Sequence, residues 1–407
     1  MPEPASLPPG GGLAQLASAL VEVGPLSGAL DSPPRVAPLG PGTERPADVA
    51  AVQTLIDRLA CELGMRAPQV VADPSGLVAA ELAISNRLGL AALLDRPSSV
   101  GDVSDALVAA TVRQTRRGLP AVTVAAAPDG STLRCYDVGP PAGPVVVLVS
   151  ACGMPVGLLR RWMIGLSDRF RVLTWESRGM FPAREAPPGW AAHQTLDGDF
   201  DQREYDVPTQ AGDLHAVLDA FDVEAAHVVG LCGGAAVALA AGSARVRSLS
   251  LWHGDYELGP DVPKTRHQQD VQSLMLMAGR RRERAAGLHA LLRRPATLES
   301  LRADLAHELI YPYASAELLY RYGRLNGAIM TTDCRPLLAG IDLPTLVVSS
   351  MADTTAHPEG SIVVASRIPG ARLELLPQGD HLAAFDATPE LIELARAFVD
   401  QVQRGET

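Results

Sequence analysis

A cysteine between glycines stands where a buried strand is predicted to turn into a helix. The segment reads Val228-Val229-Gly230-Leu231-Cys232-Gly233-Gly234-Ala235. A reactive residue held at strained backbone angles in such a corner needs small neighbours two residues before and two residues after it, and Gly230 and Gly234 fill these positions. The corner directs the sulfur at the N-terminus of the helix, whose dipole and free N–H groups favour a thiolate and a developing oxyanion. The pattern therefore predicts that Cys232 is a covalent nucleophile.

A candidate acid and a candidate base follow two later strands. Residues 349–353 read Ser-Ser-Met-Ala-Asp after one predicted strand, and residues 378–381 read Gln-Gly-Asp-His after the last one. A histidine within reach of the thiol would act as the base, and a carboxylate would orient that histidine. We expect His381 to be the base and Asp353 the acid, with Asp255 and Asp380 as alternative acids.

The elements that must position these residues alternate between strand and helix from residue 120 onward. This alternation predicts an α/β fold with a mostly parallel, twisted sheet and helices on both faces. The continuous apolar, β-branched run 145–150 is typical of a strand that is buried on both faces. The predicted strands are 122–127, 132–138, 145–150, 171–175, 226–231, 248–252, 346–349 and 373–376.

Composition divides the chain into four parts. Residues 1–47 are rich in Pro and Gly and are expected to form a flexible arm. Residues 48–118 carry three helical patterns (48–63, 76–93 and 101–116) and predict a small helical domain. The α/β core is expected at 119–258 and 340–407, and the intervening residues 259–339 predict a helical insertion that forms a lid.

Charge and cysteine usage narrow the class of protein. A net charge of -11 disfavours nucleic acids and anionic membranes as partners, and Arg280–Arg284 is the one conspicuous basic run, expected to be a solvated helix face or a docking patch. The five cysteines show no spacing typical of a metal site or a disulfide framework. We expect a cytoplasmic protein that binds no metal and no cofactor.

These motifs together resemble the α/β-hydrolase superfamily. The family's G-x-S-x-G elbow appears here as G-L-C-G-G, and the family's order of nucleophile, acid and histidine is kept. Residues 174–179 resemble its Asp-x-Arg-Gly turn. The resemblance implies that the Gly233 N–H is one oxyanion donor and that the second lies in the loop 151–154, at Cys152 or Gly153. Cys152 is expected to serve this loop rather than to form a disulfide with Cys232.

A cysteine in place of the family's usual serine at the nucleophile position suggests a resemblance to a narrower group of enzymes. The cysteine elbow, the segment Trp252-His253-Gly254-Asp255-Tyr256 and the helical insertion resemble the cysteine-dependent aminoacyltransferases of nonribosomal peptide pathways. This resemblance implies transfer of an acyl group, in particular an aminoacyl group, between the phosphopantetheine arms of carrier proteins. It also implies that Trp252, Asp255 and Tyr256 bind substrate, with Asp255 or Glu257 pairing with an ammonium group.

The helical domain carries a further resemblance. Residues 75–82 and 94–100 look like carrier-protein helix motifs, but Ser75-Gly76 replaces the Asp-Ser that would accept phosphopantetheine. A degenerate carrier-like domain that serves in docking and a plain helical bundle both fit this pattern.

The chemistry of a thioester leaves two enzymatic readings open. An acyl group on Cys232 keeps its transfer potential, so it can pass to a second thiol or amine, or water can release it as in a thioesterase or dienelactone-type esterase. A non-catalytic docking protein that retains the fold is the third reading. It predicts that Cys232 is no more reactive toward iodoacetamide than Cys135.

Overall fold

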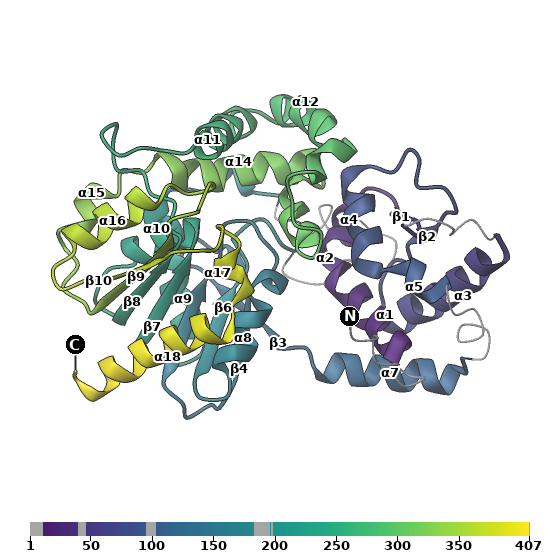
Figure 1. Ribbon diagram of the computed structural model, residues 1–407, viewed down its shortest axis with the longest axis horizontal. Coiled ribbons are helices and arrows are strands. Elements are labelled where there is room, and N and C mark those ends of the chain that lie inside the picture. The colour runs from purple at the N-terminus through teal and green to yellow at the C-terminus, as the bar shows by residue number, and fades with distance from the viewer. Residues whose placement is uncertain (1–10, 40–45, 95–102, 183–195, 197, 407) are drawn as a thin grey trace. The chain divides into compact units, whose positions relative to one another are not determined.

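The computed structural model describes residues 11–39, 46–94, 103–182, 196 and 198–406 (Figure 1). The chain divides into two compact units. One groups Met1–Pro120 with Arg184–Leu196 and Ala286–Leu318, and the other groups Ala121–Ala183 with Asp197–Ala285 and Leu319–Thr407. We call the first the helical unit and the second the sheet unit.

An eight-stranded sheet forms the centre of the sheet unit, in the order β10-β9-β8-β7-β5-β6-β4-β3. Neighbouring strands from β10 to β6 run parallel, whereas β4 is antiparallel to both β6 and β3. The α/β class with a mostly parallel sheet, predicted from the alternation of strands and helices, is confirmed. The strands are β3 Ala121–Ala126, β4 Thr132–Val138, β5 Val145–Val149, β6 Arg171–Trp175, β7 Ala226–Leu231, β8 Val246–Trp252, β9 Thr345–Ser350 and β10 Arg372–Leu376.

Helices cover both faces of this sheet, as Figure 1 shows. On one face α8 (Arg160–Leu166) packs with α18 (Pro389–Arg404), and on the other α9 (Val207–Ala220) packs with α10 (Gly233–Ala240). Every residue of β7 and of β9 is buried, as expected of central strands that helices cover on both sides. Two further helices, α16 (Pro358–Arg367) and α17 (Ala383–Asp386), and two short 3₁₀ turns, Val156–Leu159 and Phe200–Gln202, complete the connections of the sheet unit.

Parallel strands bring their carboxyl ends to one edge of the sheet. The loops that follow β5, β7, β8, β9 and β10 therefore emerge side by side. Cys152, Cys232, Asp255, Asp353 and His381 each lie in one of these loops, within a few residues of the strand end. The topology alone thus gathers side chains that are far apart in the sequence.

The insertion predicted at 259–339 is helical. It contains α11 Arg266–Ala278, α12 Arg282–Leu292, α13 Ala306–Leu309, α14 Ala316–Thr331 and α15 Arg335–Leu338, with 3₁₀ turns at Pro295–Leu298 and Tyr311–Tyr313. Residues Ala286–Leu318 of this segment group with the helical unit, and the rest group with the sheet unit. The structure therefore divides the insertion between the two units.

The helical unit corrects the expected flexible arm. Residues 11–39 of that arm form α1 (Gly11–Glu22), α2 (Gly24–Ala29) and β1 (Arg35–Val36). The apolar side chains of α1 recur every three or four residues, and Leu16 and Leu20 are almost completely buried. Composition misled here, because the Pro and Gly residues flank a short amphipathic helix. Residues 1–10 and 40–45 of the arm lie outside the described residues.

The remaining elements of the helical unit are α3 Pro46–Leu63, β2 Gln69–Val70, α4 Ala79–Leu88, α5 Leu90–Leu94 and α7 Asp105–Arg117. Strand β2 pairs with β1 in a small parallel sheet. The helix predicted at 76–93 is split at Gly89, which adopts φ +60 and ends α4 with a left-handed cap. Among the described residues, no helix combines the length and apolar character needed to cross a membrane.

Candidate active site

The corner between β7 and α10 holds Cys232 in a strained conformation. Its φ of 54 is rare for a residue other than glycine. The Cys232 N–H donates to the Trp252 carbonyl at 3.0 Å, and its carbonyl accepts from the Ala235 N–H at 3.0 Å, so both neighbouring elements fix the turn. A Cβ on Gly230 would lie 2.7 Å from the Ala235 Cα, and one on Gly234 would collide with the Val149 carbonyl. Both glycines are therefore required by close approach of the backbone.

His381 and Asp353 meet beside this corner. The Asp353 Oδ2 lies 2.8 Å from the His381 Nδ1, and both side chains are almost completely buried. The Asp353 Oδ1 accepts the backbone N–H groups of Thr355 and Ala356 at 2.8 and 2.9 Å. The loop after β9 therefore fixes the carboxylate, and the carboxylate fixes the imidazole.

The environment of the site favours an ion pair between the Asp353 carboxylate and the His381 imidazolium. Burial alone would raise the pKa of the Asp353 carboxyl, but hydrogen bonds from His253 and His381 outweigh it and hold that pKa well below its usual range. Burial alone would lower the pKa of the His381 imidazole, but the Cys232 charge and the Asp353 carboxylate raise it well above its usual value. The His381 Nε2 has no conventional hydrogen-bond partner among the described residues. It is close enough to the Cys232 sulfur for the two groups to interact, which suits transfer of the thiol proton.

A second imidazole shares the same carboxylate oxygen. The His253 Nδ1 lies 3.0 Å from the Asp353 Oδ2, and the His253 side chain is completely buried. The sequence contains His253 in the segment after β8, but nothing in its spacing assigned it a role. Its position directly after a strand end, on the edge that carries the other polar loops, is the signal from which the sequence could have placed it at the site.

The three candidate acids are distinguished by their contacts. Asp353 contacts His381 directly, whereas the Asp255 Oδ1 accepts from the Gln268 Nε2 at 2.7 Å. Asp380 is exposed, and its Oδ1 accepts from the Ala383 N–H at 3.1 Å. Only Asp353 of the three therefore makes the hydrogen bond that an orienting acid requires.

The loop after β5 leaves fewer backbone N–H groups that could donate to an oxyanion. The Gly153 N–H donates to the Ser177 Oγ at 2.8 Å and is therefore not available to a substrate, which corrects that part of the prediction. Gly233 begins α10, so its N–H has no acceptor within the helix. No described residue accepts from the Cys152 N–H. The Gly233 and Cys152 amides are thus the remaining candidates for donors.

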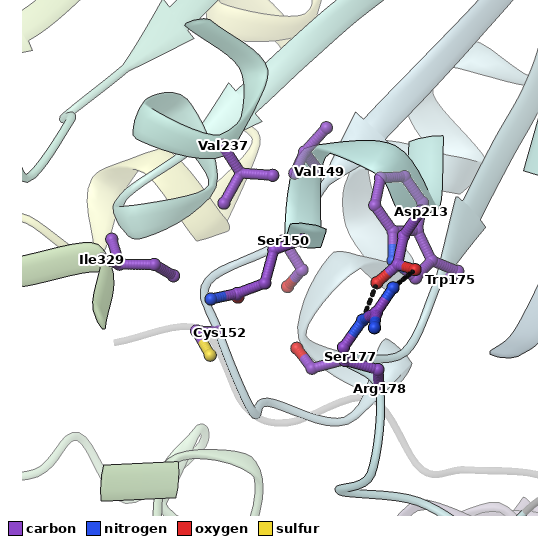
Figure 2. A pocket seen from close by; sticks show the side chains of 10 residues that line it. Val149, Ser150, Cys152, Trp175, Ser177, Arg178, Asp213, Val237 and Ile329 are labelled. Atoms are coloured by element: carbon purple, nitrogen blue, oxygen red, sulfur yellow. Dashed lines mark hydrogen bonds and ion pairs between the residues drawn. The ribbon is translucent and has the colours of Figure 1, made fainter. Parts of the chain in front are cut away.

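Cys152 borders a small pocket behind this loop. Figure 2 shows its sulfur near Ser150 and Ser177, with the buried pair of Arg178 and Asp213 on the far wall. Burial raises the pKa of the Cys152 thiol to about 12, so this sulfur stays protonated at neutral pH. All five cysteines of the chain are free.

Asp255 and Tyr256 lie near the nucleophile. The Asp255 N–H approaches the Cys232 carbonyl at 3.4 Å. The buried Tyr256 hydroxyl has no hydrogen-bond partner among the described residues, and it interacts electrostatically with both Asp255 and Cys232. Glu257, the alternative partner for an ammonium group, already pairs with Lys264 at 2.5 Å.

Trp252 does not fit the predicted role in substrate binding. Its side chain is completely buried, its Nε1 donates to the Ser250 Oγ at 2.7 Å, and its ring packs edge-to-face on Trp162 at 4.9 Å. Trp252 is therefore a core residue between β8 and α8. Strand alternation explains the error, because Trp252 is still the last residue of β8 and its side chain points to the face of the sheet that α8 covers.

Helix α14 contributes side chains that the sequence did not indicate. The Tyr322 ring lies directly against Gly153, and Asn326 and Ile329 lie near Gly233. The Asn326 Nδ2 donates to the Tyr322 hydroxyl at 3.1 Å. This part of the insertion lines the site, and an amphipathic helical pattern carries no signal of which of its residues would do so.

One cluster has the composition of a metal site. Of the His, Cys, Asp and Glu side chains that the structure describes, only His253, Asp353 and His381 bring three ligand atoms within 4.8 Å of one another. The two hydrogen bonds to Asp353 already use these atoms, so the arrangement is explained without a metal.

Comparisons with known proteins agree with this fold. The chain is 22% identical over 284 residues to 3-oxoadipate enol-lactonase 1 of Acinetobacter baylyi, a match that covers 67% of this chain and 95% of that protein. It is 26% identical over 249 residues to a protein of Klebsiella pneumoniae named as a carbamate hydrolase, RutD, covering 59% and 85%. No protein-family model matches the chain.

Solved structures are similar over the same share of the chain. A hydrolase from Pseudomonas aeruginosa has a TM-score of 0.50 and 25% identity, and the match covers 68% of this chain and 98% of that one. An enol-lactonase from Burkholderia xenovorans has a TM-score of 0.52 and 23% identity, covering 68% and 100%. Both proteins are thus matched over nearly their whole length, while about a third of this chain has no counterpart in either.

Proposed function

We propose that this chain, which has the fold of the α/β-hydrolases, is an enzyme that hydrolyses an ester or thioester through an acyl–Cys232 intermediate. The observation that carries the proposal is the strained Cys232 at the start of α10, beside an imidazole that a buried carboxylate orients. This arrangement has the parts that covalent acyl transfer needs, namely nucleophile, base and orienting acid.

In the first half of the reaction, the His381 Nε2 takes the Cys232 proton and the thiolate attacks the acyl carbon. The developing oxyanion would accept hydrogen bonds from the backbone N–H groups of Gly233 and Cys152. The bond from the acyl carbon to the leaving oxygen or sulfur then breaks, and the leaving group takes the proton from the imidazolium. A thioester on Cys232 remains.

In the second half, water gives a proton to the His381 Nε2 and attacks the thioester. The carbon–sulfur bond breaks, the acid is released, and the sulfur regains its proton from the imidazolium. The names of the relatives, enol-lactonase, carbamate hydrolase and hydrolase, are those of hydrolytic enzymes and support water as the acceptor.

Transfer to a carrier-bound thiol is the second candidate. Its support is the sulfur nucleophile, because exchange between two thioesters is nearly thermoneutral and preserves the acyl group for a further acceptor. A second observation is Asp255, whose backbone N–H lies 3.4 Å from the Cys232 carbonyl. Burial raises the pKa of its carboxyl group, and an ammonium group on the substrate would favour the ionised form. Acyl and peptidyl carrier proteins would then be the partners. The free cysteines suit a reducing compartment such as the cytoplasm.

The fate of the acyl group separates these candidates. We would incubate the full chain with an aminoacyl-loaded carrier protein and an unloaded one and follow both by intact mass spectrometry. Free acid alone supports hydrolysis, and loading of the second carrier supports transfer. The Cys232→Ala variant should do neither. If it retains either activity, the covalent mechanism is wrong.

A separate labelling experiment tests the non-catalytic alternative. Iodoacetamide at neutral pH should alkylate Cys232 much faster than the buried Cys135, since burial raises the pKa of the Cys135 thiol to about 12. Equal rates at the two cysteines would favour a docking protein that retains only the fold.

A further inference from the structure

The Asp353 carboxylate serves two histidines through one oxygen. The His381 Nδ1 and the His253 Nδ1 lie 2.8 and 3.0 Å from the Asp353 Oδ2. The two rings are nearly perpendicular, with their centroids 5.8 Å apart. An oxygen without a proton can only accept here, so both Nδ1 atoms must carry the hydrogens.

The backbone holds His253 in this place at a conformational cost. Its φ is 47, in the left-handed region that a residue with a large side chain rarely adopts. The His253 N–H donates to the Val348 carbonyl at 2.8 Å, which ties the turn after β8 to strand β9. Strain of this kind persists where the surroundings require one side-chain direction, and here that direction is toward Asp353.

The other ring nitrogen of His253 has no hydrogen-bond partner in the part of the chain that the structure describes. Its Nε2 is buried and makes no hydrogen bond with any described residue. A proton on this atom would be a buried, unsatisfied donor, which is costly, so we assign the neutral tautomer with its hydrogen on Nδ1. The hydrogen bond to Asp353 is therefore the one polar contact that the His253 side chain makes within the described chain.

We propose that His253 is a positioning residue whose Nδ1–H holds the Asp353 carboxylate in place and takes up part of the negative charge that would otherwise stabilise the His381 imidazolium. The inference rests on the proposed function, in which His381 must both accept and release a proton. An undivided carboxylate would hold that proton more tightly and make the imidazolium a poorer acid toward the leaving group.

Other titratable groups face the same space. Cys232 faces His381 from the start of α10, and Asp255 faces it from the loop after β8. His267 of α11 interacts with His381, Asp255 and Asp353, and Lys264 interacts with Asp255. None of these groups is changed in the variants below, so a shift in the titration of His381 reports on His253.

Two substitutions of His253 separate its hydrogen bond from its bulk. In His253→Asn the amide nitrogen replaces Nδ1 as a donor, and asparagine tolerates the left-handed backbone. In His253→Leu the donor is lost. His227→Leu is the matched control, because it removes a buried, hydrogen-bonded histidine from the opposite end of β7.

The measurement is the NMR titration of His381 in the full chain labelled at histidine, with signals assigned from His381→Gln and His253→Leu. We expect the His381 titration to move up by about one pH unit in His253→Leu. It should stay near the wild-type position in His253→Asn and in the control. Circular dichroism and thermal unfolding would check that each variant folds.

The outcomes distinguish this inference from the proposed function. An unchanged His381 titration in a folded His253→Leu variant, or equal shifts in the leucine and asparagine variants, overturns the role of His253 even if thioester turnover is normal. If the wild-type protein turns over no ester or thioester, yet the variants show the expected titrations, the proposed function is wrong. The inference that His253 positions Asp353 would then still hold.

Discussion

A buried histidine lies near each end of strand β7, and the two imidazoles behave in opposite ways. His227 belongs to the strand itself, at its amino end, whereas His381 comes from the loop after β10 and lies beside Cys232 at the carboxyl end. At the carboxyl end, the Asp353 carboxylate and Cys232 raise the pKa of His381 against the effect of burial. At the amino end, the His227 Nδ1 lies 2.8 Å from the Ser248 Oγ, and its Nε2 accepts from the Gln403 Nε2 at 2.6 Å. No carboxylate of the described residues hydrogen-bonds to this ring, and burial lowers the pKa of His227 to about 4, with Arg247 adding to the effect and the Asp400 charge opposing it.

The difference shows that a buried imidazole becomes a base only through its partner. Residue type and burial are the same at both ends of the strand, but among the described residues only His381 has a carboxylate hydrogen-bonded to its ring. The loops that follow the parallel strands emerge at the carboxyl edge, and these are the loops that carry Cys232, Asp353 and His381. The amino edge receives neutral partners that satisfy the ring and keep it uncharged.

Substitution at the two ends should affect turnover very unequally. Cys232→Ala removes the nucleophile and should lower thioester hydrolysis by roughly 10⁴-fold or more. His227→Gln at the other end should change it less than about threefold in the folded protein, because β7 and the loop at Cys232 remain in place. The check is steady-state hydrolysis of a butyryl thioester. Comparable losses of thioester hydrolysis in both variants would show that the two ends of β7 do not differ in function.

The assignment of Asp353 as the acid can be tested by comparing its substitution with that of Asp380. Asp353→Asn removes the charge that orients His381 and should lower kcat by roughly 10²- to 10⁴-fold. Asp380→Asn, beside the same histidine but exposed, is the matched control and should remain within about threefold of the wild type. Should the Asp380 variant lose as much activity as the Asp353 variant, the assignment of the acid is wrong.

The dependence of stability on pH should carry opposite signs at the two ends. The folded pKa of His227, about 4, is below the unfolded value of 6.5, so its contribution is full above pH 6.5 and is lost as the pH falls toward 4. The loss should approach about 3 kcal/mol. His381 has a raised pKa, so its contribution is present below pH 6.5 and is lost as the pH rises through its folded value.

Urea unfolding at pH 7 and pH 4.5 measures the His227 contribution. The wild type should lose stability at the lower pH, and His227→Gln should lose about 2 kcal/mol less between these two pH values. The buried His307, whose pKa is also lowered to about 4, titrates in both proteins and accounts for a loss that remains in the variant. An identical pH dependence in the two proteins would contradict the account of the amino end.

The smallest expected effect is that of Asp255→Asn on the choice between substrates. If the acyl group carries an ammonium, Asp255→Asn should lower kcat/KM for an aminoacyl thioester by about tenfold, which corresponds to ~1.4 kcal/mol. The same variant should leave a neutral acyl thioester within about threefold. The ratio of the two kcat/KM values is the measurement, and a ratio unchanged from the wild type would remove Asp255 as a determinant of specificity.

The sequence predicted the sheet and the contact between acid and base, because both follow from local patterns. Strand alternation, the glycines at 230 and 234 and the order of Cys232, Asp353 and His381 each depend on short segments. The structure brings Asp353 and His381 to 2.8 Å, as the order implied, while the catalytic roles of the three residues remain a prediction.

The parts that the sequence did not predict depend on long-range packing. Burial of Trp252 against Trp162, capture of the Gly153 N–H by Ser177 and the second imidazole on Asp353 all join segments that no local pattern relates. The helix at residues 11–22 was missed for another reason, since the Pro and Gly residues around it dominated the composition. The carrier-like reading of residues 48–118 stays a prediction.

Covalent catalysis at Cys232 is tested most directly by trapping the intermediate. The full chain would be mixed with a butyryl thioester of N-acetylcysteamine, quenched in acid within a turnover, digested and mapped by mass spectrometry. The account predicts a butyryl group on the peptide that contains Cys232, and none on the peptides that contain Cys61, Cys135, Cys152 or Cys334. Turnover of the thioester with an unmodified Cys232 peptide at every quench time would contradict it.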